Sequence, residues 1–155
     1  PLRRAQKKTV RRIFADAAYW VALLNSRDHL HAEAAALNRE LHAGQAFLVT
    51  TEFVLAEVLN FYAQAGPGAR GTAAELAASV LRHTRAEVVP STRELFTQGI
   101  SFYDQRRDKH YSLIDCISMV VMREAGITQV LTQDRHFRQE GFVPLLQPSI
   151  AFRLQ

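Results

Sequence analysis

Ile13-Phe14-Ala15-Asp16 is a short apolar run that ends in a carboxylate, and a helical pattern begins directly after it. A run of this kind is typical of a buried strand in an α/β protein. Three more acids, Glu57, Asp115 and Asp134, lie where a hydrophobic segment gives way to a new element. Carboxylates at or near the carboxyl ends of buried strands converge in the crevice where open α/β sheets bind ligands. The spacing therefore predicts one acidic site built from all four residues.

Short apolar runs alternate with longer amphipathic segments along the rest of the chain. Strands are predicted at residues 12–15, 46–50, 87–90, 129–132 and, as a last short one, 143–146. Helices are predicted at about residues 17–25, 30–43, 52–65, 71–84, 92–105 and 113–125. Strands that alternate with helices pair in parallel, because parallel neighbours need crossover connections. We therefore expect an α/β fold with a central parallel sheet of four to five strands flanked by helices.

The composition is that of a soluble globular protein, and 155 residues suffice for one domain with a substantial core. No window approaches the roughly 18 uninterrupted apolar residues of a membrane span. The basic start also lacks the apolar stretch of a secretory signal, so we expect a cytoplasmic protein. The single cysteine, Cys116, cannot form an internal disulfide, and its apolar neighbours indicate an ordinary buried residue.

The net charge of +4 originates in the first 12 residues, which hold six of the 19 basic residues and no acid. The remainder then has 13 basic against 15 acidic residues. We expect residues 1–11 to form a basic tail and residues 12–150 to form one domain. A tail of this kind engages phosphates by counterion release or is a disordered solubilising end, and the second interpretation is slightly favoured.

Local structure offers a simpler explanation for three of the four acids. Asp16 and Asp134 each precede a helical segment, where aspartate is a common N-cap that accepts hydrogen bonds from free backbone N–H groups. Ser112 and Asp115 form the Ser-x-x-Asp pattern of a capping box before an apolar helix. Each cap is adequate alone, but caps do not explain why every acid falls at the same end of the predicted sheet.

Glu57 is harder to explain locally, because it lies in the same helical row as Phe53 and Phe61. A charged glutamate on an apolar stripe needs a cation, a hydrogen-bond partner or a raised pKa. The alternative to a metal is a buried ion pair with an arginine. Converging carboxylates repel one another unless cations lie between them, and Mg²⁺ prefers oxygen ligands. We therefore favour a shared metal site suited to phosphate chemistry, as in a metal-dependent nuclease.

Other catalytic motifs are absent from the sequence. It contains no HExxH or CxxC pattern, no phosphate-binding GxxxxGK loop and no GxSxG elbow. The polar run at residues 104–110 precedes the Asp115 helix, and most such runs are solvated loops. Because this run lies beside the proposed site, we consider Arg106, Arg107 and Lys109 as candidates for binding substrate phosphates, and Tyr111 for stacking on a base.

Four segments carry a family resemblance. They are Phe14-Ala15-Asp16-Ala17-Ala18-Tyr19-Trp20, residues 50–60 around Glu57, residues 111–118 around Asp115, and Leu131-Thr132-Gln133-Asp134-Arg135-His136-Phe137. In this order they resemble the four acidic motifs of the PIN-domain ribonucleases, and within them the VapC group of toxins from toxin-antitoxin pairs. The resemblance covers about residues 12–147. It departs from the family pattern at Ile114, where threonine is common, and at His110-Tyr111, where tryptophan often follows a polar residue.

The resemblance implies a three-layer PIN-like fold, one or two Mg²⁺ or Mn²⁺ ions, and Asp16, Glu57, Asp115 and Asp134 as the acidic cluster. It implies an endoribonuclease that hydrolyses RNA phosphodiester bonds with metal-activated water and leaves 5′-phosphate and 3′-hydroxyl ends. In this scheme Asp16 and Asp115 hold the principal ion. Glu57 and Asp134 complete a second site or orient the water.

The resemblance also implies partners: an RNA substrate, an antitoxin protein whose segment covers the cleft, and a second copy of the chain in a homodimer. Exposed aromatic residues in the helices would fit such contacts, although core packing explains Tyr19, Trp20 and Phe61 equally well.

Three alternatives remain open at this point. One is a catalytically silent PIN-fold module that binds RNA or acts as a scaffold, although the complete acid set argues against it. Another is an RNA-processing PIN nuclease without an antitoxin. The third is a phosphatase of a different α/β family, but Asp16-Ala17-Ala18 lacks the second aspartate of an Asp-x-Asp nucleophile motif.

Overall fold

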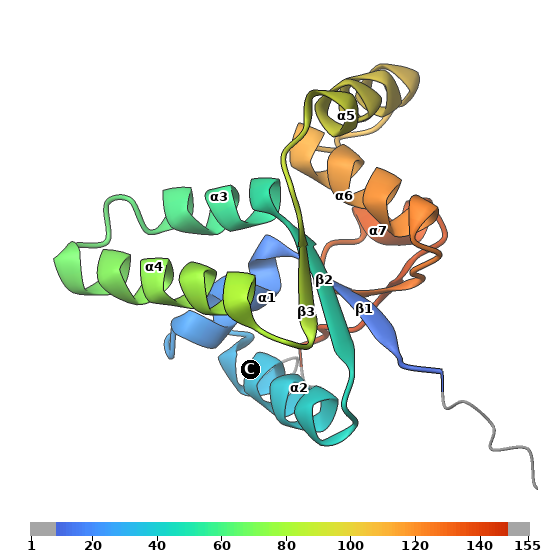
Figure 1. The fold of residues 1–155 in the computed structure, drawn as a ribbon. Helices are drawn as coiled ribbons and strands as arrows, with labels where there is room; N and C mark the ends of the chain where they lie inside the picture. Colours follow the sequence, from blue (N-terminus) through green and yellow to red (C-terminus); the bar gives the residue numbers. More distant parts are fainter. Residues whose placement is uncertain (1–8, 149–155) are drawn as a thin grey trace, which may run out of the picture.

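The computed structural model of this chain describes residues 9–148 (Figure 1). These residues form the strands β1 (Arg12–Ala15), β2 (Phe47–Thr51), β3 (Ala86–Val89), β4 (Gln129–Leu131) and β5 (Val143–Pro144). The helices are α1 (Ala17–Leu24), α2 (His31–Ala43), α3 (Glu52–Phe61), α4 (Pro67–Arg82), α5 (Arg93–Gln105), α6 (Leu113–Glu124) and α7 (His136–Gln139). Most of the expected basic tail lies outside the described residues. None of the described helices has the length and apolar character needed to cross a membrane.

The five strands are parallel and lie in the order β3-β2-β1-β4-β5, which confirms the predicted parallel sheet. In the central strand, Phe14 lies in register with Val49 of β2 on one side and with Val130 of β4 on the other. The chain places β2 and β3 on one side of β1 and then returns to place β4 and β5 on the other. The strand order therefore reverses between β1 and β4, and ligands of open α/β sheets bind at such a switch point.

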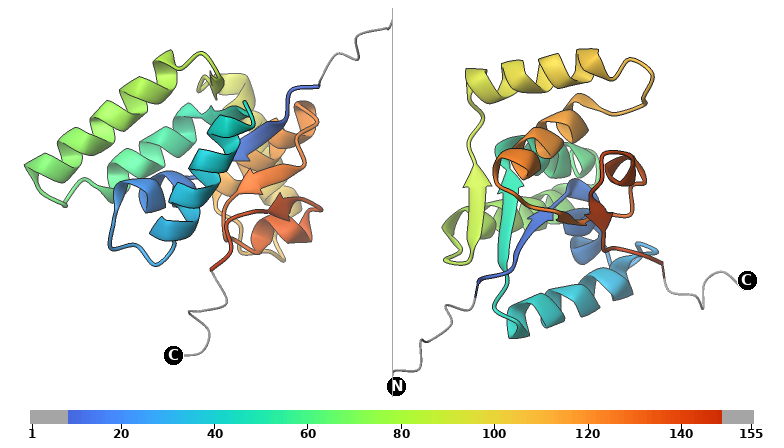
Figure 2. Two further views of the ribbon diagram at one scale, coloured as in Figure 1. Left: turned by 90° about the horizontal axis from the view of Figure 1, so that it is seen from below. Right: turned by 90° about the vertical axis from the view of Figure 1, so that its right-hand side faces the viewer.

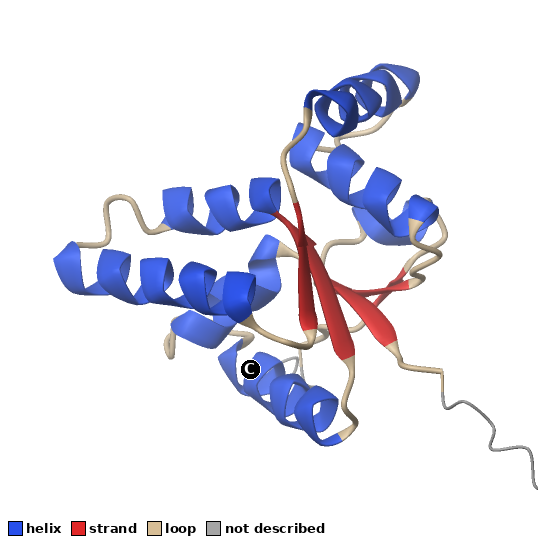
Figure 3. Ribbon diagram, in the orientation of Figure 1, coloured by secondary structure: helices blue, strands red, loops and turns tan. Residues whose placement is uncertain are grey.

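Helices cover both faces of the sheet, so the fold has three layers (Figure 3). In Figure 1, α1, α3 and α4 lie to the left of the strands, whereas α6 and α7 lie to the right. A parallel strand covered on both faces is apolar throughout rather than alternating. Accordingly Ile13, Phe14 and Ala15 of β1 are fully buried, and they lead directly to Asp16 at the carboxyl end of the strand.

Three aromatic residues considered for partner contacts have different environments. Tyr19 and Trp20 are buried in the core, and the Tyr19 hydroxyl donates a hydrogen bond to Asn38. Phe61 at the end of α3 is 61% exposed. Core packing therefore accounts for the first two residues and leaves only Phe61 available at the surface.

Threonine and serine caps explain where two of the helices around the site begin. The Thr51 hydroxyl accepts a hydrogen bond from the Val54 N–H at the start of α3. Ser112 and Asp115 form a complete capping box at the start of α6, as the sequence predicts. Helix α3 begins immediately after β2, and α6 begins after the loop that follows α5. The first turns of both helices therefore lie at the edge of the sheet where the switch point is.

Helix α4 begins at Pro67, four residues before the start predicted at residue 71. The sequence Gly66-Pro67-Gly68 suggests a break between helices. Proline is nevertheless favoured in the first turn of a helix, because a backbone N–H at that position would have no hydrogen-bond partner within the helix. Gly66 precedes it with a φ of 87°, a left-handed conformation that glycine adopts readily.

Helices α5 and α6 pack closely against each other, with α5 on the outside (Figure 2). A Cβ atom added to Gly99 of α5 would lie 2.3 Å from Cγ1 of Ile117, a fully buried residue of α6. The glycine therefore permits the approach of α5, which carries the loop at residues 106–112 toward the start of α6.

Candidate functional site

All four predicted acids line one open cleft at the carboxyl edge of the sheet. Asp16 follows β1 and Asp134 follows β4, so these two lie on either side of the strand switch point. Glu57 comes from the middle of α3, and Asp115 from the first turn of α6. Ser112 and Thr132 complete the polar lining of the cleft, together with Gln133.

Asp16 is the most deeply buried of these acids, with 7% of its surface exposed. Asp16 occupies the N-cap position of α1, but its side chain makes no capping hydrogen bond to that helix. Instead its Oδ2 accepts a hydrogen bond of 2.9 Å from the Thr132 hydroxyl. Burial raises the pKa of Asp16 to about 7, and the nearby carboxylates of Asp115 and Glu57 add to the rise.

Asp115 combines the capping and cleft roles. Its Oδ2 accepts the backbone N–H of Ser112 at 2.8 Å, and its own N–H donates to the Ser112 hydroxyl at 3.0 Å. Its carboxylate nevertheless lines the cleft. Burial raises the pKa of Asp115, the charge of Asp134 raises it further, and the hydrogen bonds with Ser112 oppose the rise. The cap thus fixes the position of this carboxylate.

The predicted environment of Glu57 was partly wrong. The buried face of α3 consists of Val54, Leu55 and Val58, whereas the row through Glu57 runs outward to the exposed Phe61. Glu57 is half-buried at the cleft, and burial and the charge of Asp115 raise its pKa. Among residues 9–148 no arginine forms an ion pair with it. Helical spacing identified the row correctly but not the face that the core covers.

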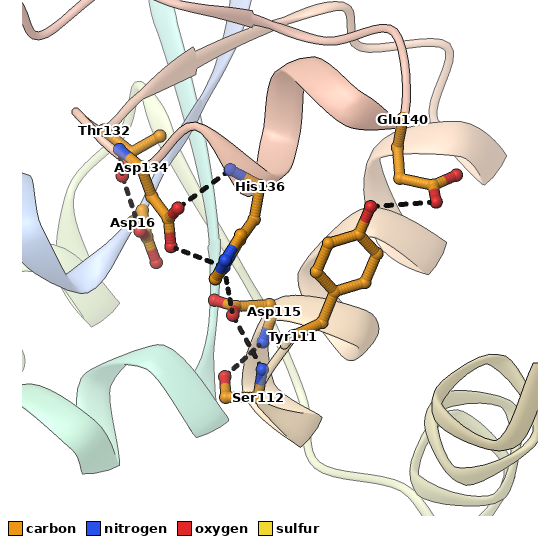
Figure 4. Close-up of polar contacts among 8 residues, drawn as sticks. All are labelled: Asp16, Tyr111, Ser112, Asp115, Thr132, Asp134, His136 and Glu140. Carbon is orange, nitrogen blue, oxygen red and sulfur yellow. Dashed lines mark hydrogen bonds and ion pairs between the residues drawn. The ribbon is translucent and has the colours of Figure 1, made fainter. Parts of the chain in front are cut away.

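Asp134 is held by backbone hydrogen bonds on both sides (Figure 4). Its N–H donates to the Thr132 hydroxyl at 3.1 Å, and its Oδ1 accepts the N–H of His136 at 2.8 Å. Its Oδ2 remains directed toward the imidazole of His136, whose Nδ1 lies 3.3 Å away. The cap predicted for the short segment after Asp134 was wrong, because the N-cap residue of α7 is Arg135 and no side chain caps this helix. Asp134 instead closes a local turn onto the His136 N–H with one carboxylate oxygen.

Two residues of the site were missed by sequence reasoning. Thr132 contacts both Asp16 and Asp134 through one hydroxyl group. The Nδ1 atom of His136 lies 3.3 Å from Asp134 and 3.8 Å from Asp115. Both residues stand two positions from Asp134, inside the segment that carries the fourth acid, and this proximity in sequence is the signal that could have identified them.

The loop cations predicted to bind phosphate are already engaged in ion pairs. Arg106 binds Glu140 through two hydrogen bonds, and Glu140 also binds Arg123 and accepts a hydrogen bond from the Tyr111 hydroxyl. These contacts, first of all those with Arg106, lower the pKa of Glu140. Tyr111 is 5% exposed, so the suggestion that it stacks on a base was wrong in this structure.

Arg107 and Lys109 differ from Arg106 because their partners are exposed. Arg107 pairs with Asp104 at 2.6 Å, and Lys109 pairs with Asp108 at 3.1 Å. Exposed pairs of this kind contribute little to stability and exchange readily for other anions. The two cations line a hollow together with Arg106 and Tyr111, and Tyr111 directly precedes Ser112 of the acidic cleft.

A second group of cations, which the sequence did not single out, adjoins the acidic cleft through Asp134. A hollow beside α7 is lined by Asp134, His136, His110, Gln139 and two arginines, Arg135 and Arg138. Both arginines are exposed, and within residues 9–148 neither side chain has an ion-pair partner. Asp134 is therefore shared between the acidic cleft and a basic surface.

The donor set of the cleft fits a divalent cation. Four carboxylates share one cavity, and the pKa values of Asp16, Glu57 and Asp115 are raised by burial and by neighbouring acids. In the described part of the chain, His136 is the single basic side chain at ion-pair distance from any of the four. A metal ion would relieve this repulsion, and carboxylate oxygens suit Mg²⁺ and Mn²⁺.

Comparisons with known proteins agree with this architecture. The PIN domain family model matches residues 13–142. The protein named 23S rRNA-specific endonuclease VapC20, from two strains of Mycobacterium tuberculosis, is 32% identical over 133 residues, which cover 84% of this chain and 95% of that protein. The crystal structure of Mycobacterium tuberculosis VapC20, titled a Sarcin-Ricin loop cleaving toxin, matches with a TM-score of 0.73 and 28% identity. That match covers 87% of this chain and 99% of the VapC20 chain.

Proposed function

The chain belongs to the PIN-domain family, and we propose that it is a metal-dependent endoribonuclease that acts as the toxin of a toxin-antitoxin pair. The observation that carries this proposal is the single cleft that Asp16, Glu57, Asp115 and Asp134 line together at the strand switch point. Family membership and similarity to an RNA endonuclease over most of the chain support it.

The residues of the cleft would have different roles in metal binding and catalysis. Asp16 and Asp115, the two more buried acids, would hold a Mg²⁺ or Mn²⁺ ion, while Glu57 and Asp134 would hold a second ion or accept a proton from the attacking water. A bound ion of this class supplies an activated water and offsets the charge that builds up on the phosphate oxygens. Thr132 keeps Asp16 in place through its 2.9 Å hydrogen bond. Hydrolysis in line with the 3′ oxygen would leave 5′-phosphate and 3′-hydroxyl ends.

Ribosomal RNA is the first substrate class to test. VapC20 is named for its action on 23S rRNA, and the match spans nearly the whole of that protein. We extend the substrate class to this chain on the basis of that similarity, without assigning a cleavage position.

The exposed cations around the cleft support a path for the RNA backbone. Arg135 and Arg138 lie beside Asp134, and Arg107 and Lys109 lie in the neighbouring hollow next to Tyr111. Arginine and lysine bind phosphates without regard to sequence and position the strand for cleavage. The contacts of Arg106 with Glu140 favour a structural role for that residue, although it was predicted to bind substrate.

The partners belong to the same proposal. An antitoxin segment would cover the acidic cleft, and its basic side chains would find four carboxylates there. A second copy of the chain is proposed as the partner for exposed apolar side chains such as Phe61 of α3 and Phe96, Ile100 and Tyr103 of α5. Co-expression with a small protein encoded by the adjacent gene, followed by copurification, tests the antitoxin part.

The decisive experiment measures cleavage of ribosomal RNA and of a simple phosphoester, with Mg²⁺ or Mn²⁺ and with EDTA. We expect metal-dependent cleavage of RNA alone, and its loss in Asp16→Asn. The matched control is Glu75→Gln, which removes an exposed acid of α4 outside the cleft. Melting curves establish that both variants fold. EDTA-resistant cleavage, or equal activity in Asp16→Asn, would contradict the proposal, and absence of cleavage would favour a silent RNA-binding module.

A further inference from the structure

The side chain of His136 lies where it could bind a metal ion together with acids of the cleft. Its Nδ1 atom, an oxygen of Asp115 and an oxygen of Asp134 all lie within 4.8 Å of one another. We propose that His136 supplies a nitrogen ligand to the second cation of the cleft, which Asp134 would bind together with a shared Asp115 carboxylate, and that this nitrogen favours Mn²⁺ over Mg²⁺. The inference rests on the metal site of the proposed nuclease and adds a residue that the four-acid assignment does not contain.

The separations between the donor atoms suit a shared ion. Nδ1 of His136 lies 3.3 Å from Oδ2 of Asp134 and 3.8 Å from Oδ2 of Asp115. In an octahedral site with metal–ligand bonds of about 2.1 Å, adjacent donor atoms lie about 3 Å apart and opposite ones about 4.2 Å apart. Both measured separations fall in this interval.

Hydrogen bonding does not account for the position of the imidazole. Nδ1 is inaccessible to solvent and has no hydrogen-bond partner, because its approach to the carboxylate oxygens lacks hydrogen-bond geometry. Buried polar atoms are rarely left without a partner in a folded protein, and a cation is a partner that a neutral imidazole nitrogen binds. A cation between the three side chains would satisfy Nδ1 and both carboxylates together.

Packing against Tyr111 holds the imidazole of His136 in this position. The ring of Tyr111 packs against it with a centroid separation of 5.3 Å, and the Tyr111 hydroxyl donates to Glu140 (Figure 4). Glu140 is in turn fixed by Arg106 and Arg123. The backbone N–H of His136 also binds Asp134, so ring and carboxylate are oriented as one unit. Second-layer contacts of this kind are what keep metal ligands in place.

The chemistry of a nitrogen ligand sets the expected selectivity. Mg²⁺ binds almost entirely through oxygen atoms and keeps several waters. First-row transition ions accept imidazole more readily, so one nitrogen among oxygens shifts a site toward Mn²⁺. Without His136 the site would retain its carboxylates and lose this preference.

The test loads the full chain with Mn²⁺ and records pulsed electron paramagnetic resonance. A ligand nitrogen within bonding distance gives a ¹⁴N coupling, which should change to a ¹⁵N pattern when histidine is isotopically labelled. We expect the coupling in the wild type and in His110→Gln, and its loss in His136→Gln. His110 is a matched control because it is an exposed histidine of the hollow beside α7.

Calorimetry with Mn²⁺ and with Mg²⁺ provides the second readout. We expect His136→Gln to weaken Mn²⁺ binding by at least about tenfold, since even residues that only orient ligands contribute that much. Mg²⁺ binding should change far less. Mn²⁺ binding that is abolished by Asp115→Asn but shows no nitrogen coupling would overturn this inference and leave the metal site intact. Binding of Mg²⁺ without Mn²⁺ by the wild type would overturn the inference alone, and failure to bind either ion would overturn both the inference and the metal-dependent function.

Discussion

The hydroxyl of Thr132 donates a 2.9 Å hydrogen bond to Oδ2 of Asp16, although the two residues are 116 positions apart in the chain. The Thr132 hydroxyl oxygen in turn accepts the N–H of Asp134 at 3.1 Å. One buried hydroxyl therefore sets the positions of two acids that follow different strands. It does so at the carboxyl ends of β1 and β4, where the strand order reverses and the acidic cleft opens.

Replacing Thr132 with valine keeps the shape of the side chain and removes the hydrogen bond. Asp16 then loses its fixed partner, and we expect metal affinity and RNA cleavage to fall by about tenfold or more. Calorimetry with Mn²⁺ and initial cleavage rates measure the effect, and Thr132→Ser should restore most of both. A valine variant with wild-type affinity and rate would show that the hydroxyl has no role in the site.

The metal-free protein should become less stable as the pH rises. The folded-state pKa of Asp16 is about 7 against an ordinary value of 3.8, so between these values the native state retains a proton that the unfolded chain releases. The stability that this proton confers is fully present below about pH 4 and is lost as the pH passes through about 7. Glu57 and Asp115 are shifted in the same direction.

Urea denaturation in EDTA at about pH 5 and at about pH 8 measures this dependence. We expect the wild type to lose more stability between the two conditions than Asp16→Asn, which cannot ionise at this position. Added Mn²⁺ should stabilise the wild type more at the higher pH, because ligands bind cations in the deprotonated form. Equal pH dependence in the two proteins would contradict the assigned shift.

Glu140 should matter for stability rather than for RNA binding. Its side chain is 7% exposed and neutralises Arg106 and Arg123, whose guanidinium groups also lie over the ring of Phe102. We expect Glu140→Ala to cost about 2 kcal/mol of unfolding free energy, since both arginines retain access to solvent. Chemical denaturation measures the loss. A variant as stable as the wild type would show that this cluster is incidental.

Arg135 and Arg138 should matter for RNA binding rather than for stability. Replacing both with alanine should leave stability nearly unchanged and weaken RNA binding, which is best measured in the Asp16→Asn background to prevent cleavage. Each lost phosphate contact lowers the slope of log affinity against log salt by about 0.7 for single-stranded RNA. Arg82→Ala, at the exposed end of α4, serves as the control. An unchanged slope would exclude this surface from the RNA path.

The sequence was sufficient for the order and type of the strands and of the helices α1 to α6, whereas the short helix α7 was not among the predicted helices. β1 spans the predicted residues 12–15, and its buried part, Ile13 to Ala15, is apolar at every position because it is covered on both faces of the sheet. The alternation of strands and helices likewise predicted a parallel sheet, and with it the edge at which the acids meet. Local patterns carry this information because chain direction and crossover geometry follow from element order.

Side-chain environments were less predictable. The helical row of Glu57 was identified, but which face of α3 is buried depends on the packing of neighbouring helices. The environment of Tyr111 also depends on packing that the sequence does not reveal. Tyr111 was considered for stacking on an RNA base, but its ring packs against His136 and its hydroxyl donates a hydrogen bond to Glu140. The hydrogen bond between Thr132 and Asp16 joins segments that are distant in the sequence, so no local sequence pattern predicts it.

The nuclease activity proposed for this chain depends on a cation bound among the four carboxylates. A crystal of the chain soaked in Mn²⁺ tests this through anomalous scattering recorded from the metal. We expect an anomalous peak for the principal ion inside the cleft, at about 2.1 to 2.3 Å from oxygens of Asp16 and Asp115, with Glu57 and Asp134 bordering it. A well-ordered cleft with no peak, or a peak bound only by acids elsewhere on the surface, would contradict it.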